Sequence, residues 1–169
     1  MVAALGIGWQ MLAFVELLLM GVWLGSMVFF SFAVAPSAFA VLPSRHLSGQ
    51  IVTSTISKVE TLGLIIGPLI LLIQIVSWRA RHSRGLSNAL RPALVVVMIV
   101  AAALSKFWVS SAMVSLRNQM GGLIDDVPAT DPLRLQFNDL HQYSVALMAL
   151  AMFAGIVALF FTVRSWLKH

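Results

Sequence analysis

Four long apolar stretches, separated by shorter polar ones, dominate the hydrophobic pattern of this chain. They predict helices over residues 9–34, 62–78, 93–114 and 141–163. A helix needs about 20 mostly apolar residues to cross the hydrocarbon core of a bilayer, and each stretch is close to or above that length. The stretches also lack the alternation of apolar and polar residues that marks the strands of a membrane barrel. The pattern therefore predicts an all-α, integral membrane four-helix bundle.

A weaker pattern lies between the first and second of these helices. Over residues 44–58, apolar side chains recur at helical spacing among Ser, Thr and Gln. This spacing predicts an amphipathic segment, which either lies at the membrane interface or extends the second helix outward. With this segment included, residues 1–169 are predicted to form a single transmembrane domain.

Three prolines predict where the helices end, bend and begin. Pro36 lacks a backbone donor and restricts Ala35, so the first helix is expected to end before it. Pro68 interrupts the second helix, where we expect a kink. Pro92 is expected in the first turn of the third helix, where a missing N–H does no harm.

Composition and charge agree with a membrane protein. The chain is 60% hydrophobic and 10% charged, whereas charged residues make up about a quarter of a soluble domain. Basic residues gather after the second and fourth helices, and acids gather between the third and fourth. The positive-inside rule therefore places both termini in the cytoplasm. Because the net charge of +5 is explained by orientation, no nucleic-acid partner is expected. The residues compared are Arg79, Arg81, Arg84, Arg91, Arg164 and Lys168 against Asp125, Asp126, Asp131 and Asp139.

Small residues four positions apart predict close contacts between helices, because they let two backbones approach. Such contacts form either within the bundle or with another membrane protein, and the pattern leaves both readings open. The pairs are Gly21 and Gly25, Gly63 and Gly67, and Ala151 and Gly155.

Two ionisable residues, Glu16 and Lys106, fall inside the apolar stretches. At membrane depth each costs a few kcal/mol unless it is paired or hydrated. They lie at different depths and are not expected to pair, and Glu16 has no evident base within the membrane. Glu16 is thus either a neutral acid that is hydrogen-bonded inside the bundle, a proton or cation site, or a contact with another subunit.

Further polar residues are expected to meet at the outer end of the bundle. They form either a salt-bridge network between helix ends or a ligand site, with His141 and Glu60 as candidate cofactor-binding residues. His141 and His46 are candidate metal ligands, because His is the commonest ligand of transition metals. One His with scattered acids is a weak metal pattern, and haem or pigment binding is left open. The expected group is Glu60, Lys106, Asp139, His141 and Ser144.

Several local patterns resemble the transmembrane-protein-205-like family, whose bacterial members are four-helix domains of unknown function. The resemblance implies a four-helix protein of a bacterial inner membrane and no defined activity. CopD-like and HemJ-like membrane proteins are more loosely similar, but they carry a His where this chain has Glu16, so only the architecture carries over. The patterns are Trp23-Leu24-Gly25, the run Val28–Pro36 followed by Phe39 and Leu42, Phe107-Trp108-Val109 with Leu116-Arg117, and Phe137-x-x-Leu140-His141-x-x-Ser144.

Three hypotheses for function follow. The chain has no Cys, phosphate-binding loop or nucleophile elbow, so no catalytic residue is predicted. The first hypothesis is a non-catalytic accessory or structural subunit that contacts the bilayer and other membrane subunits, or that self-associates. The alternatives are a haem- or metal-handling oxidoreductase that uses His141, and a small proton-coupled transporter that uses Glu16 and Lys106.

Overall fold

The fold is a bundle of four helical rods, seen in a computed structural model that describes residues 2–81, 86–121 and 127–166. Each rod contains a segment that is long and apolar enough to cross a membrane. The predictions of an all-helical fold and of four spans are therefore confirmed. The first rod comprises α1 (Val2–Phe29), the π-helical η1 (Phe30–Val34) and α2 (Ala35–Val41), and the second is α3 (Arg45–Arg81). The third comprises α4 (Leu86–Leu104), the π-helical η2 (Ser105–Ser110) and α5 (Ser111–Gln119), and the fourth is α6 (Pro132–Trp166).

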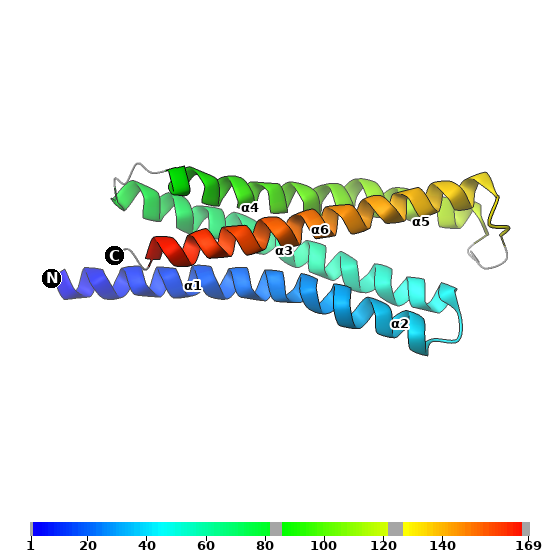
Figure 1. The fold of residues 1–169 in the computed structure, drawn as a ribbon, viewed down its shortest axis with the longest axis horizontal. Coiled ribbons are helices and arrows are strands. Elements are labelled where there is room, and N and C mark those ends of the chain that lie inside the picture. Colours follow the sequence, from blue (N-terminus) through cyan, green and yellow to red (C-terminus); the bar gives the residue numbers. More distant parts are fainter. Residues whose placement is uncertain (1, 82–85, 122–126, 167–169) are drawn as a thin grey trace.

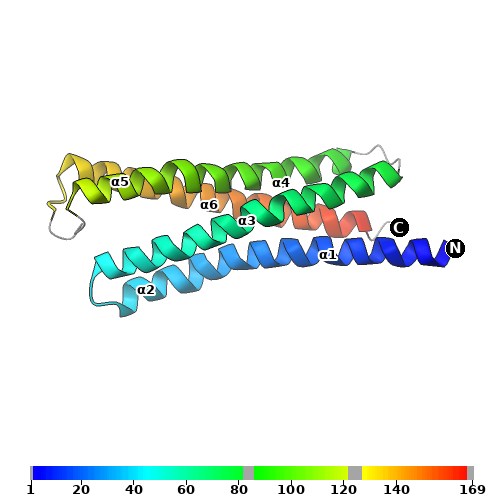
Figure 2. The same cartoon turned by 180° about the vertical axis from the view of Figure 1, so that it is seen from behind.

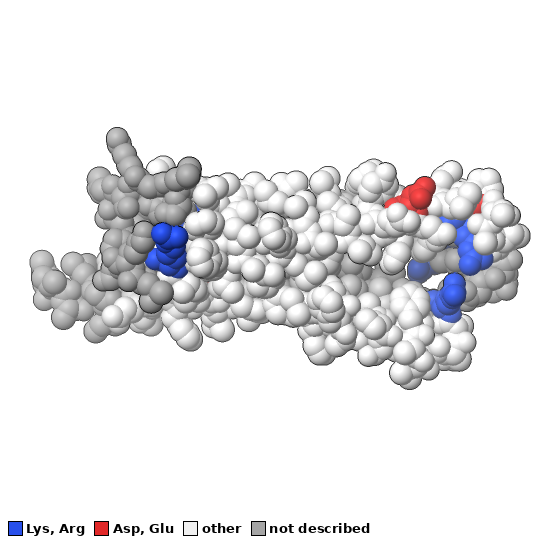
Figure 3. Space-filling model, viewed as in Figure 1, with Lys and Arg blue, Asp and Glu red and all other residues white. Residues whose placement is uncertain are grey.

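The two chain ends lie at the same end of the bundle, here called the terminal end (Figure 1). The end of α2 and the start of α3 lie at the opposite, distal end, as do the end of α5 and the start of α6. At the distal end the α2–α3 pair and the α5–α6 pair diverge (Figure 2). On the face drawn in Figure 3, charged side chains lie near the two ends, and the described surface between them is uncharged. Such an uncharged band is what the hydrocarbon core of a bilayer requires.

The rods are longer than the sequence predicts, because hydropathy marks only the length of a helix that crosses the hydrocarbon core. Residues 44–58 extend the second helix outward, with the Leu47 N–H donating to Ser44 Oγ at 3.2 Å. The fourth helix begins at Pro132 and not at residue 141. Pro68 lies inside α3, which continues through it. Of the charges compared above, Arg84, Asp125, Asp126 and Lys168 lie outside the described residues.

Two expectations about proline are wrong. The first rod passes Pro36, because the π-helical turn η1 widens the backbone and the Ala35 N–H donates to Phe30 O. This turn moves the hydrogen-bonding frame by one residue and leaves Pro36 in the first turn of α2, where no N–H is needed. Pro92 is not in a first turn either, since α4 already begins at Leu86.

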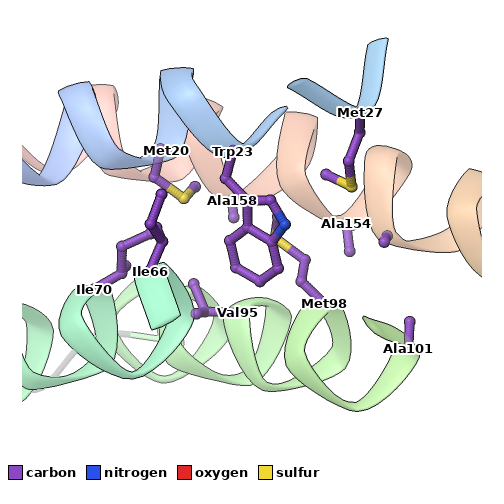
Figure 4. Close-up of a cluster of buried hydrophobic side chains, with 11 residues drawn as sticks. Met20, Trp23, Met27, Ile66, Ile70, Val95, Met98, Ala101, Ala154 and Ala158 are labelled. Atoms are coloured by element: carbon purple, nitrogen blue, oxygen red, sulfur yellow. The ribbon is translucent and has the colours of Figure 1, made fainter. Parts of the chain in front are cut away.

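The core lies in the middle of the bundle, around Trp23 of α1 (Figure 4). Small residues of the other helices let the backbones close around this indole. A Cβ atom at Gly63 would lie 2.5 Å from Trp23 Cε2, and one at Gly67 would lie 2.8 Å from Ile99 Cδ1. The buried residues are Met20, Trp23 and Met27 of α1, Ile66 and Ile70 of α3, Val95, Met98 and Ala101 of α4, and Ala151, Ala154 and Ala158 of α6.

Candidate functional site

A buried ion pair joins α1 to α4 in the half of the bundle nearer the terminal end. Arg91 Nη2 donates to Glu16 Oε1 at 2.6 Å and to Glu16 Oε2 at 2.8 Å. Glu16 is 0% and Arg91 7% exposed. The expectation that Glu16 has no base within the membrane is therefore wrong. Arg91, which was counted as a loop charge, supplies that base because α4 begins earlier than predicted and directs this side chain inward.

The other two helices complete the hydrogen bonding of this pair. Gln74 of α3 donates to Glu16 Oε1 at 2.9 Å. From α6, Thr162 Oγ1 accepts from Arg91 Nε at 3.3 Å, and Ser165 Oγ accepts from Arg91 Nη1 at 2.8 Å. All four rods thus contribute to one network. Such pairing offsets much of the cost of burying two charges, and it fixes how the four helices are arranged.

A second buried polar group lies deeper in the bundle, near η2. Ser105 Oγ donates to Glu60 Oε1 at 2.5 Å, and Glu60 is 3% exposed. The neighbouring Lys106 bonds to two other residues of α3. Its Nζ donates to Ser57 Oγ and Thr61 Oγ1, each at 2.9 Å. Glu60 and Gln74 are 14 residues apart on α3, which places the two polar groups about 21 Å apart along the helix axis. They are separate networks.

Replacing Ser105 with alanine is expected to destabilise the protein by about 1–3 kcal/mol, because the buried Glu60 carboxyl would lose the hydroxyl that donates to it. The midpoint of unfolding in a titration with sodium dodecyl sulfate, followed by circular dichroism, measures this effect. Ser111→Ala, at an exposed position of α5, is the matched control. Equal midpoints for the two variants would show that the Ser105–Glu60 hydrogen bond contributes nothing.

The polar group expected at the outer end does not form one network. Among the described residues, no ion pair joins Glu60, Lys106, Asp139 and His141. Asp139 and His141 are exposed, whereas Ser144 is buried. Glu60 lies deeper in the bundle than expected, because α3 begins well before residue 62 and carries Glu60 into the interior.

A groove of about 500 Å³ opens at the distal end, between the diverging helix pairs. Most of its lining is apolar, and Arg117 and His141 are the residues with ionisable side chains among those that line it. Figure 3 shows the surface hollowed at this end, with Lys and Arg side chains beside the hollow. The lining comes from η1 and α2 (Phe30, Ser31, Phe32, Ala35, Pro36, Phe39), α3 (Val52, Thr53, Ile56), η2 and α5 (Ser110, Met113, Val114, Arg117) and α6 (His141, Ser144, Val145, Met148, Ala149, Met152).

Arg117 is a residue of this groove that the sequence analysis assigned to no site. Its guanidinium carbon lies 5.7 Å from the ring centre of Phe137, and a Cβ atom at Gly49 would lie 3.2 Å from its Nη2. Its Nε is buried without a hydrogen-bond partner. No acid of the described residues lies within ion-pair distance of it. The signal in the sequence that could have indicated a site was an arginine near the end of the third rod, seven residues after Ser110, with no acid close to it in the sequence.

The two candidate metal ligands show no metal-site geometry. The Nε2 atoms of His46 and Gln50 lie 2.9 Å apart, which indicates a hydrogen bond. His141 faces the groove on α6. In the described parts of the chain, no three His, Asp or Glu side chains gather as they would around a metal ion.

Comparison with known protein families places this architecture. Residues 18–121 match the family described as Domain of unknown function (DUF4149). The protein belongs to the DUF4149 family. The match covers the greater part of the chain, from within α1 to the end of α5. No curated protein and no solved structure matches the chain.

The DUF4149 match contains some of the polar residues described above and leaves out others. Arg91, Glu60 and Arg117 fall within it, whereas Glu16 and His141 fall outside. Both the buried ion pair and the groove are therefore built partly from residues before or after the matched segment. They depend on α6 or on the first half of α1 to be complete.

The small residues of this DUF4149 protein divide into two groups. Gly63, Gly67 and Gly155 face neighbouring helices, and a Cβ atom at Gly155 would lie 3.0 Å from Met98 Cε. In contrast, Gly21 and Gly25 are exposed, and a Cβ atom at either would meet nothing within 4 Å. The first group makes room inside the bundle, and Gly21-x-x-x-Gly25 faces outward.

Proposed function

We propose that this DUF4149 protein is a non-catalytic membrane subunit, which binds a transmembrane helix of a partner protein along α1. The observation that carries the proposal is the outward position of Gly21 and Gly25 within a candidate membrane span. Two glycines four residues apart leave a shallow trough on a helix, and a second backbone packs closely into such a trough. Of the residues that the structure describes, none on another helix lies within 4 Å of a Cβ atom built at either glycine, so the trough is open.

The residues around these glycines continue the same face of α1. Phe14, Leu18, Val28 and Phe32 are exposed and recur with the glycines at alternating intervals of three and four residues. That repeat gives a continuous seam along a helix, with large side chains at both ends and the trough between them. We name residues 14, 18, 21, 25, 28 and 32 the α1 seam. Its length suits a helix that lies alongside α1 through much of the bilayer.

The buried polar groups support a structural role. Glu16 is paired with Arg91, and Lys106 is bonded to Ser57 and Thr61. These contacts hold helices together, and they occupy Glu16 and Lys106, the two residues that the transporter alternative uses. The oxidoreductase alternative keeps His141 in the groove, but among the described residues His141 belongs to no group of three potential metal ligands.

The proposal also covers the membrane in which the protein lies and the family that it most resembles. We place the protein in a bacterial inner membrane with its terminal end in the cytoplasm, since α3 ends there with Arg79 and Arg81 and no acid lies between them. The burial of Arg91 narrows the difference in exposed charge between the two ends. The resemblance to the transmembrane-protein-205-like family is supported by two of its patterns, which supply the core indole of Trp23 and the groove residues His141 and Ser144.

Replacing both seam glycines with leucine is expected to abolish stable partner association, because the side chains fill the trough and keep the second backbone away. The tagged chain is purified from its native membrane in mild detergent, and native mass spectrometry gives the ratio of the chains that elute together. We expect a fixed ratio for the natural chain and the lone chain for Gly21→Leu/Gly25→Leu.

The control is Ala146→Leu, which introduces a leucine at an exposed position of α6 outside the seam. It is expected to retain the partner at the natural ratio. Elution of the natural chain alone, or retention of the partner by the double glycine variant, would contradict the proposal.

A further inference from the structure

We propose that the groove at the distal end holds one anionic phospholipid, with an acyl chain along its apolar wall and the phosphate at Arg117. This inference stands apart from the subunit function, because the groove lies between the helix pairs and the α1 seam residues 14–28 do not line it. Phe32 is shared between the two surfaces, at the end of the seam.

The length of the groove matches one leaflet of a bilayer. Along α6 its lining runs from His141 to Met152, eleven helical steps that span about 16 Å at 1.5 Å per residue. The hydrocarbon core is about 30 Å thick, so a single leaflet contributes about 15 Å. The volume of about 500 Å³ also lies within the range of pockets that enclose a small ligand.

The groove is apolar at its deep end and carries a cation near the distal end of the bundle. Its deeper part, around Phe30, Met148 and Met152, is apolar, and Arg117 lies near the distal end of the third rod. A cation at the level of the head groups with an apolar wall below it complements a molecule with an anionic head and an apolar tail. An anionic phospholipid of the surrounding leaflet has this chemistry and reaches the groove sideways from the bilayer.

The guanidinium of Arg117 is held in position for an anion. The guanidinium carbon lies 5.7 Å from the ring centre of Phe137, and Gly49 of α3 leaves room for Nη2 of Arg117. A guanidinium presents several N–H donors in a planar fork, which can bind two oxygens of a phosphate. No described acid competes for this charge.

The apolar wall is adaptable as well as long. Met113, Met148 and Met152 contribute three flexible thioether side chains to it. Methionine adjusts to ligands of different shape without loss of contact. We therefore expect the site to select the head group by charge and to accept acyl chains of different length.

The test is a titration of the detergent-solubilised full chain with dioleoyl phosphatidylglycerol or dioleoyl phosphatidylcholine, followed by native mass spectrometry. We expect one tightly bound phosphatidylglycerol and about tenfold weaker binding of phosphatidylcholine. Arg117→Gln is expected to weaken phosphatidylglycerol binding about tenfold, to the level of phosphatidylcholine. Arg45→Gln removes a charge at the same end of the bundle, outside the groove, and is expected to leave both affinities unchanged.

A second pair of variants tests the apolar wall. Ala149→Phe fills the groove from α6, whereas Ala146→Phe adds the same ring at an exposed position outside it. We expect the first variant to lose phosphatidylglycerol and the second to keep it. Equal affinity for the two lipids, equal effects of the two arginine variants, or retention of lipid by Ala149→Phe would each overturn the proposal.

Discussion

Replacing Arg91 with leucine is expected to lower the free energy of unfolding by about 3–5 kcal/mol, because Glu16 would remain buried without its charged partner. The loss extends beyond the ion pair. Thr162 and Ser165 of α6 would also lose the donors that now reach them from Arg91. A titration with sodium dodecyl sulfate, followed by circular dichroism in mixed micelles, measures the change.

Two further variants show whether the charge or the packing matters. Arg79→Leu removes an exposed arginine near the same end of the bundle and is expected to change stability by less than about 0.5 kcal/mol. Glu16→Leu/Arg91→Leu removes both charges together and is expected to recover much of the loss, since no unpaired charge remains. A double variant as unstable as Arg91→Leu would show that an unpaired Glu16 is not the cause.

Replacing Gly63 with leucine is expected to destabilise the bundle by about 3 kcal/mol, because the new side chain would overlap the buried indole of Trp23. Even the first atom of that side chain, Cβ, would lie 2.5 Å from Trp23 Cε2. Neither α1 nor α3 can move away without opening the core that surrounds Trp23. The same detergent titration measures this effect.

Gly21→Leu is the matched control, since it makes the same change on α1 where a Cβ atom meets nothing within 4 Å. Its free energy of unfolding is expected to stay within about 0.5 kcal/mol of that of the natural protein. Trp23→Ala/Gly63→Leu should be less destabilised than the sum of its two single variants, because the leucine occupies space that the indole leaves. Strict additivity would contradict the proposed overlap.

The two glycine positions show what the local sequence can predict and what only the tertiary contacts decide. Gly21 and Gly63 each begin a Gly-x-x-x-Gly pattern, and the sequence treats the two alike. Only the rotation of each helix in the bundle decides that Gly63 meets Trp23 and that Gly21 faces outward. That rotation depends on the packing of four helices at once.

The candidate sites were partly visible in the sequence. Glu16 and Lys106 stood out as ionisable residues at membrane depth, and both lie within candidate spans. Arg91 was hidden because it precedes Pro92, which suggested a helix start and therefore a loop. Arg117 was hidden because a groove between helix pairs is made of residues far apart in the chain.

The sequence by itself determined the all-helical class and the four spans. Both follow from the length and apolarity of each stretch, which local hydropathy reports, because every backbone group in a membrane must be bonded within its own helix. The tertiary structure alone decided the partner of Glu16, the direction of each glycine pair and the groove beside Arg117. These features arise where side chains from different helices meet, and no spacing along a single helix specifies which faces come together.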